Sequence, residues 1–286
     1  MLKKLPTSLR FWLRSLEHKF AGFFTTLYKY KPYKKGVSSY VIPKSSLTDR
    51  QADNVELAVP PQEFWLGYGK TREEYLSSGA EDTQKMLELA KSSGLTLTAG
   101  DRVLDFGCGA CRMTRHLQKY AQSCEIWGVD IDADMIYWCK EHLEPLFNFA
   151  VTTTIPHLPF EDRYFDLIYA GSLFTHVDDL TEAWLLELRR ILSPKGRLYL
   201  TIHDNQTIKL LHTDFQNIFL SKKLRASDLY NQTKNDMAVL TIGRDTGSQV
   251  FYDIDYFCKK LSKLYKIHSV TTEAYNYQTA VLVGRK

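Results

Sequence analysis

The sequence predicts an α/β fold: a doubly wound sheet covered by helices on both faces. From Arg102 onward, short apolar runs alternate with segments of helical spacing, which is typical of parallel strands joined by crossover helices. A glycine turn, Gly107–Gly109, follows the first run, and an acid, Asp130, closes the second. Both belong to the carboxyl edge of such a sheet, where ligands bind.

Each expected element follows from a local pattern. Apolar residues at helical spacing predict a helix over 64–93, which Gly94 ends. The expected strands, seven in all, are 102–106, 125–130, 147–152, 164–170, 196–203, 266–272 and 279–284. The expected helices are 112–121, 132–144, 178–192 and 252–264. The Ser-Pro-Lys-Gly run after Leu192 is expected to stop the third of these sharply.

Residues 1–62 are expected to form a basic amphipathic arm and a connector, ahead of one domain over 63–286. Residues 1–36 carry nine Lys or Arg and one acid, and their apolar residues from Leu5 to Leu27 recur at spacings of three and four. Such a helix either packs on the domain or gives peripheral membrane contact; an organellar transit peptide also fits this composition. The polar segment 205–250 is expected to be a cap or insertion.

Composition narrows the function. Residues 37–286 carry a net charge of −4, which argues against broad binding of nucleic acid by the main domain. The five cysteines are scattered and form no paired metal-binding spacing, so we expect no metal site. Reduced thiols indicate a cytoplasmic protein, membrane-associated if the arm binds lipid.

The turn after the first strand selects between two cofactors. A nicotinamide dinucleotide requires a third glycine for its pyrophosphate, and Arg112 occupies that position. Asp105, just before the turn, would repel a pyrophosphate but suits a cation. Asp130 is placed to bind both hydroxyls of a ribose. These charges favour S-adenosylmethionine, and Arg112 is expected to support the following helix.

Four stretches, VLDFGCGACRMTRHL, WGVDID, LPFEDRYFDLIYAGSLFTHVDD and ELRRILSPKGRLYLT, resemble the motifs of class I S-adenosylmethionine-dependent methyltransferases of the small-molecule type, in the family's order. The resemblance implies a Rossmann-like sheet and assigns Asp130 to the ribose and Ile131 to the adenine. Thr154 stands where the family often has an adenine-binding acid, and Cys111 replaces a usual glycine. The resemblance places Asp105, Gly107 and Gly109 at the methionine end, and Cys108, in the same turn, is a further candidate cofactor-binding residue.

The methyl acceptor is expected past the fourth strand, over GSLFTHVDD. His176 and Asp178 are the candidates to orient or deprotonate it, although His176 fits a structural histidine equally well. The expected reaction is in-line transfer of a methyl group to a small-molecule or lipid-like acceptor. The Asn-Pro-Pro turn and the Pro-Cys nucleophile of nucleic-acid methyltransferases do not occur. An NAD-dependent oxidoreductase and a non-catalytic binding protein of the same fold are the alternatives.

Overall fold

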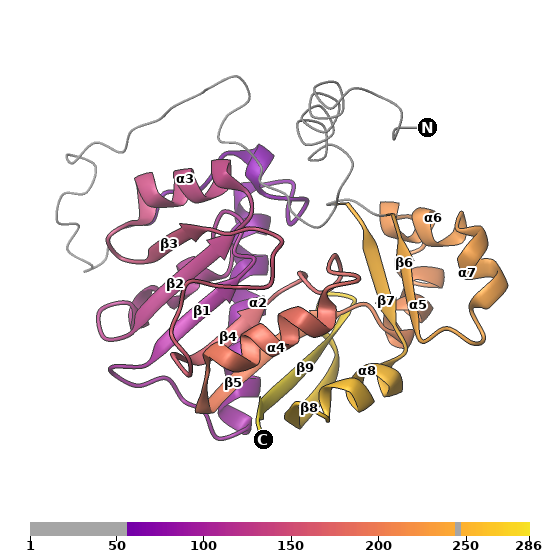
Figure 1. The fold of residues 1–286 in the computed structure, drawn as a ribbon. Helices are drawn as coiled ribbons and strands as arrows, with labels where there is room; N and C mark the ends of the chain where they lie inside the picture. The colour runs from indigo at the N-terminus through magenta and orange to yellow at the C-terminus, as the bar shows by residue number, and fades with distance from the viewer. Residues whose placement is uncertain (1–55, 244–246) are drawn as a thin grey trace, which may run out of the picture.

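The computed structural model describes residues 56–243 and 247–286 (Figure 1). The amphipathic arm and most of the connector predicted for 1–62 lie outside these residues. Over the described residues, no helix combines the length and apolarity needed to cross a bilayer.

The predicted seven-stranded, doubly wound sheet is confirmed. Its strand order is β3-β2-β1-β4-β5-β9-β8, and β1 to β5 are parallel, whereas β9 runs antiparallel to both of its neighbours. The strand order reverses between β1 and β4, which is where such sheets bind ligands. The strands are β1 (Arg102–Phe106), β2 (Glu125–Asp130), β3 (Asn148–Val151), β4 (Phe165–Ala170), β5 (Leu192–Ile202), β8 (Tyr265–Tyr275) and β9 (Gln278–Arg285).

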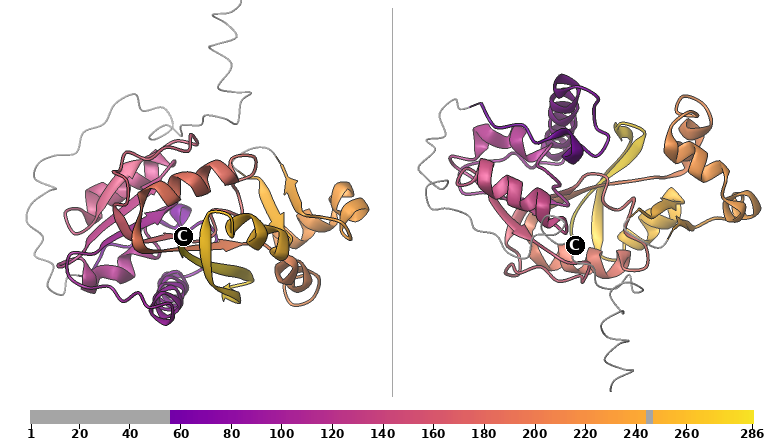
Figure 2. Two further views of the ribbon diagram at one scale, coloured as in Figure 1. Left: turned by 60° about the horizontal axis from the view of Figure 1, so that its bottom comes forward. Right: turned by 90° about the horizontal axis from the view of Figure 1, so that it is seen from above.

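Helices cover both faces of the sheet, because successive strand side chains point to opposite sides. In β1, Val103 packs with α2, η4 and α3, whereas Leu104 packs with α4 and α8. Figure 2 shows α2 and α4 on opposite sides of the strands. These helices are α2 (Arg72–Ser92), the 3-10 helix η4 (Thr114–Tyr120), α3 (Ala133–Leu143), α4 (Thr181–Ile191) and α8 (Ile254–Leu261), and a short 3-10 turn, η3 (Gln62–Phe64), precedes them.

Several predicted boundaries are wrong, each for a local reason. The helix expected from residue 64 begins at Arg72, because the Thr71 hydroxyl accepts the N–H of Glu74 and caps it. The helix expected from residue 252 begins after Asp253, whose carboxylate caps the N–H of Tyr256.

Two further predictions fail in the segments next to the sheet. The helix expected over 112–121 is the 3-10 helix η4. There α2 packs directly on the backbone, since a Cβ on Gly79 would lie 2.3 Å from the Arg112 carbonyl oxygen. The Ser-Pro-Lys-Gly run does not lie between elements but within β5, where the pairing with β4 shifts register between Phe165 and Leu167.

The segment 205–250 forms a small layer beside the main sheet, drawn in orange in Figure 1. It has its own apolar cluster, which includes Leu211, Leu224 and Phe251. Its elements are α5 (Asn205–His212), α6 (Phe219–Arg225), α7 (Asp228–Thr233), β6 (Val239–Ile242) and β7 (Gln249–Tyr252). Strand β7 reaches the main sheet at a parallel bridge between Phe251 and His203.

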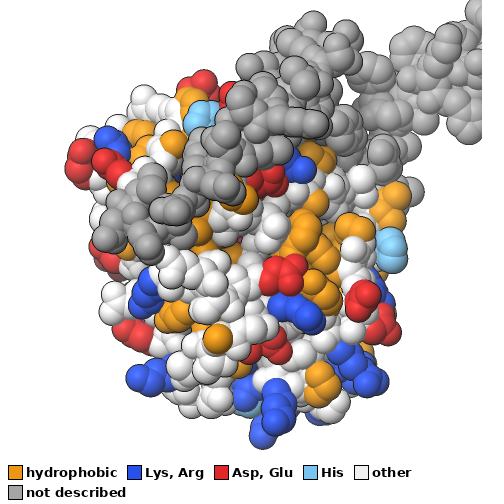
Figure 3. Space-filling view, turned by 90° about the vertical axis from the view of Figure 1, so that its left-hand side faces the viewer, with side chains coloured by type: hydrophobic (Ala, Val, Ile, Leu, Met, Phe, Trp, Pro, Cys, Tyr) orange, Lys and Arg blue, Asp and Glu red, His pale blue; other side chains and the backbone are white. Residues whose placement is uncertain are grey.

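On the face drawn in Figure 3, Lys and Arg side chains are interspersed with Asp and Glu side chains. Mixed charge of this kind is typical of a solvated protein surface.

Candidate functional site

A cavity of about 870 Å³ lies at the carboxyl edge of the parallel strands. Small-molecule sites commonly measure about 300–1,000 Å³, so this one has room for a cofactor and a second ligand. The structure brings all nine predicted site residues to its wall: Asp105, Gly107, Cys108, Gly109, Asp130, Ile131, Thr154, His176 and Asp178.

The glycine turn between β1 and η4 forms the floor of one half of the cavity. Gly107 and Gly109 have positive φ angles, 84° and 52°, which glycine adopts without strain. The N–H groups of Gly107 and Cys108 both donate to the Val129 carbonyl, at 2.8 and 3.1 Å, and so tie the turn to β2. Cys111, where the family usually has glycine, also has a positive φ of 65°. Its backbone therefore keeps the conformation that glycine favours.

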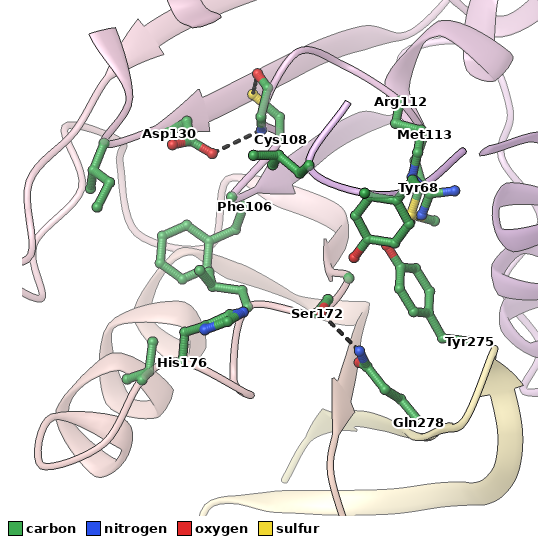
Figure 4. A pocket seen from close by; sticks show the side chains of 18 of the residues that line it. Tyr68, Phe106, Cys108, Arg112, Met113, Asp130, Ser172, His176, Tyr275 and Gln278 are labelled. Carbon is green, nitrogen blue, oxygen red and sulfur yellow. Dashed lines mark hydrogen bonds between the residues drawn. The ribbon is translucent and has the colours of Figure 1, made fainter. Parts of the chain in front are cut away.

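Asp130 lies at the end of β2 with both carboxylate oxygens held. One oxygen accepts the N–H of Gly109 and the other the N–H of Asp132, each at 2.8 Å. Figure 4 draws the bond between Asp130 and the glycine turn. Burial raises the pKa of Asp130, and these two backbone bonds oppose the rise. Each carboxylate oxygen can accept a further bond, so Asp130 can take two hydroxyls of a ligand.

Asp105 is almost fully buried at the end of β1. It is 4% exposed, and its carboxylate accepts the hydroxyl of Thr114 at 2.6 Å. Burial raises its pKa to about 7. The carboxyl is therefore ready to ionise when a cation arrives.

Three other predicted cofactor residues complete this half. Ile131 and Thr154 are half-buried and line the wall next to Asp130. Cys108 is buried, and its sulfur lies 3.5 Å from the Gly109 carbonyl oxygen, beneath the turn.

Arg112 has a role that its sequence context did not indicate. Its guanidinium donates to Asp82 at 2.6 Å and to the hydroxyl of Tyr275, and it lies 3.9 Å from the centre of the Tyr68 ring. These contacts join the segment before α2, α2 itself and the end of β8 along one side of the cavity (Figure 4). Tyr275 is 163 residues from Arg112, so no local pattern could have paired them.

A second polar group missed from the sequence links β4, β5 and β9. Gln278 donates to the Ser172 hydroxyl at 2.8 Å (Figure 4) and accepts the Thr201 hydroxyl at 2.7 Å. The N–H of Ser172 donates to the same Thr201 hydroxyl at 2.7 Å. These bonds fix the start of the loop that carries His176.

His176 is half-buried and lines the other half of the cavity. Its Nδ1 lies 2.7 Å from the carbonyl oxygen of Ser248, a contact in which the ring nitrogen must be the donor. Burial lowers the pKa of His176, helped by Lys223, so the ring is neutral at pH 7. A neutral ring protonated at Nδ1 leaves Nε2 as a proton acceptor.

Asp178 and His203 lie in the same half. Asp178 is half-buried, and its carboxylate accepts the N–H of Asp179 at 2.7 Å. His203 follows β5, is 2% exposed and packs against the rings of Phe251 and Tyr277. Burial lowers the pKa of His203 to about 3, so its ring is also neutral.

Comparison with known proteins agrees with this geometry. A family model described as "Methyltransferase domain" matches residues 104–200, the part that carries the glycine turn, Asp130 and His176. A solved structure of a Pyrococcus horikoshii protein superposes with a TM-score of 0.52 at 18% identity, covering 79% of this chain and 100% of that one. This likeness shows the fold.

Curated relatives resemble the central part of the chain. Demethylmenaquinone methyltransferase of Tropheryma whipplei is 31% identical over 104 residues, which are 36% of this chain and 42% of the relative. Malonyl-[acyl-carrier protein] O-methyltransferase of Hahella chejuensis is 24% identical over 141 residues, 47% of this chain and 50% of the relative. The chain thus spans half or less of the length of these relatives.

The predicted motifs, the sheet order and the match to the family model agree with one another. Residues 104–200 of this chain therefore resemble a methyltransferase domain, on a sheet with the expected strand order.

Proposed function

We propose that the protein transfers a methyl group from S-adenosylmethionine to a small-molecule acceptor. The observation that carries this proposal is one continuous cavity with two chemically distinct halves. One half has the glycine turn with Asp105 and Asp130, and the other has the neutral imidazole of His176. This arrangement suits a cationic nucleoside cofactor beside a nucleophile that must lose a proton.

The residues of the first half fit the cofactor. Asp130 offers two acceptor positions to the ribose hydroxyls, and Ile131 and Thr154 would lie along the adenine. A Cβ on Gly107 would lie 3.1 Å from Leu173 side-chain atoms, so any side chain here would have to displace Leu173 at a backbone φ of 84° that favours glycine. Asp105 would attract the methionine ammonium. Bound S-adenosylmethionine supplies an electrophilic methyl group on a sulfonium.

In the second half, His176 acts as the proton acceptor through Nε2. Positioning of the two reactants supplies much of the rate in such a displacement, and a general base typically adds about 10²–10⁴-fold. Asp178, on the same loop, is the proposed residue to orient the acceptor.

Two properties of the cavity wall disfavour the alternative functions: its charges disfavour a dinucleotide, and its proton acceptor disfavours a purely structural domain. Among the described residues that line the cavity, Arg112 is the one Lys or Arg, and Asp82 already pairs with it. A dinucleotide pyrophosphate would therefore meet Asp105 and Asp130 with no available counter-ion. A purely structural domain would not require a proton acceptor held at the wall of a cavity.

We also propose a cytoplasmic location and a small-molecule partner rather than nucleic acid. The five cysteines are free, and the sulfurs of Cys111 and Cys139 lie 3.2 Å apart, an arrangement that a reducing compartment preserves.

Calorimetric titration tests the function. The full-length protein is expected to bind S-adenosylmethionine and S-adenosylhomocysteine, and to give no heat with NADH. Binding of NADH without binding of S-adenosylhomocysteine would support the oxidoreductase instead.

A further inference from the structure

The half of the cavity that holds His176 is enclosed mainly by apolar side chains. Some come from the loop after β4 and from α4, and others from the cap segment before and within α6. The apolar lining residues are Leu173, Val177, Leu180, Trp184, Phe215 and Ile218. Phe219 also lines the cavity and is 76% exposed, so the mouth itself is apolar. A ligand here buries hydrocarbon surface rather than charge.

Among the described residues, no Lys or Arg lines this half of the cavity. Lys223, which helps to lower the pKa of His176, is not a lining residue, and its ammonium donates to the Gly247 carbonyl at 2.9 Å. The side chain of Arg112 lies on a different side of the cavity from His176 (Figure 4), and Asp82 neutralises it at 2.6 Å. The acids on the described wall, Asp105, Asp130 and Asp178, make an anion less favourable still. Burying an unpaired carboxylate or phosphate here would be costly.

One polar group of this half is fixed by the cap rather than by the sheet. The Ser248 carbonyl accepts a hydrogen bond from the Nδ1–H of His176 at 2.7 Å, and the Ser248 hydroxyl donates to the His176 carbonyl at 2.8 Å. These two hydrogen bonds join the chain before β7 to the loop after β4. They hold the imidazole ring so that its Nε2 is left as the hydrogen-bond acceptor. His203 is neutral too and adds no positive charge.

We propose that the methyl acceptor is an uncharged, largely apolar compound whose hydroxyl group faces Nε2 of His176. This inference rests on the proposed function and names its substrate class. The hydroxyl proton passes to Nε2, and the oxygen electron pair forms the new O–CH₃ bond. The S–CH₃ bond breaks with its electron pair going to sulfur, which becomes a neutral thioether. The imidazolium then releases its proton to solvent.

Three naphthalene probes test the class by calorimetry on the full-length protein saturated with S-adenosylhomocysteine: 2-naphthol, its methyl ether 2-methoxynaphthalene, and the anion 2-naphthoate. They share one ring system and differ in the group offered to His176. The variant His176→Asn keeps a donor for the Ser248 carbonyl and lacks Nε2. The matched control is His142→Asn, because Nδ1 of His142 makes the same kind of contact, 2.9 Å from the Trp138 carbonyl oxygen, outside the cavity wall.

We expect the wild type to bind 2-naphthol about tenfold more tightly than its ether, the effect of one buried hydrogen bond, and to bind 2-naphthoate no better than the ether. His176→Asn should remove this preference, and His142→Asn should keep it. The proposal is overturned if 2-naphthoate binds as well as 2-naphthol, if the preference survives His176→Asn, or if 2-naphthol does not bind the wild type. Failure of the proposed function shows separately, as loss of S-adenosylhomocysteine binding in the first titration.

Discussion

Replacing Asp130 with alanine should weaken cofactor binding more than any other single change in the cavity. Each carboxylate oxygen of Asp130 already accepts one backbone N–H at 2.8 Å, which leaves one further acceptor position on each for a ribose hydroxyl. Hydrogen bonds to a charged group contribute about 1.5–3 kcal/mol each, so losing two costs about 3–6 kcal/mol. Calorimetric titration with S-adenosylhomocysteine should therefore show affinity lower by roughly 140- to 20,000-fold.

Asp130→Ala also removes the anchor of the Gly109 N–H, so stability has to be separated from binding. Asp166→Ala is the matched control. Asp166 likewise accepts a backbone N–H, from Arg102 at 3.0 Å, but lies at the amino end of the strands, outside the cavity wall. Both variants should unfold at lower urea concentration, and only Asp130→Ala should lose affinity. Unchanged affinity in Asp130→Ala, or an equal loss in Asp166→Ala, would refute the assignment of the ribose site.

Two further predictions concern the same turn. Because the pKa of Asp105 is raised to about 7, its carboxyl is mostly neutral at pH 6 and mostly ionised at pH 8. Affinity for S-adenosylmethionine, measured by calorimetry, should therefore rise roughly tenfold over this interval in the wild type, as the binding-competent fraction rises. Asp105→Asn should bind weakly with no such rise, and a flat wild-type profile would contradict the role of Asp105. At Cys111, whose φ is 65°, Cys111→Gly should exceed Cys111→Ala in free energy of unfolding by about 1 kcal/mol, because only glycine adopts this conformation without strain. Urea unfolding measures the difference, and an alanine variant at least as stable as the glycine variant would disprove the strain.

The first half of the site was predictable from the sequence because its signals are local. Gly107 and Gly109 are needed where a strand turns toward a ligand, and Asp130 closes the adjacent strand. In a parallel sheet, the carboxyl ends of neighbouring strands lie at the same edge. The boundaries of the elements were less predictable, since single caps such as Thr71 and Asp253 decide them.

The second half depends on contacts that no local pattern reveals. His176 was a candidate from its position after the fourth strand, with a structural role equally open. The carbonyl that fixes its tautomer belongs to Ser248, 72 residues further along the chain. In the same way, Arg112 gains its aromatic and acidic partners from α2, from the segment before it and from the end of β8.

The sequence by itself determined the sheet, the turn and the acids that suit a cationic nucleoside cofactor. Strand periodicity and turn residues are local patterns that span only a few residues. Only the tertiary structure decided the chemistry of the acceptor half. Its apolar wall comes partly from the cap segment, and the ring of His176 is oriented by a carbonyl from the chain before β7. Long-range packing sets both the polarity of a cavity and the direction of a ring nitrogen, so neither can be read from neighbouring residues.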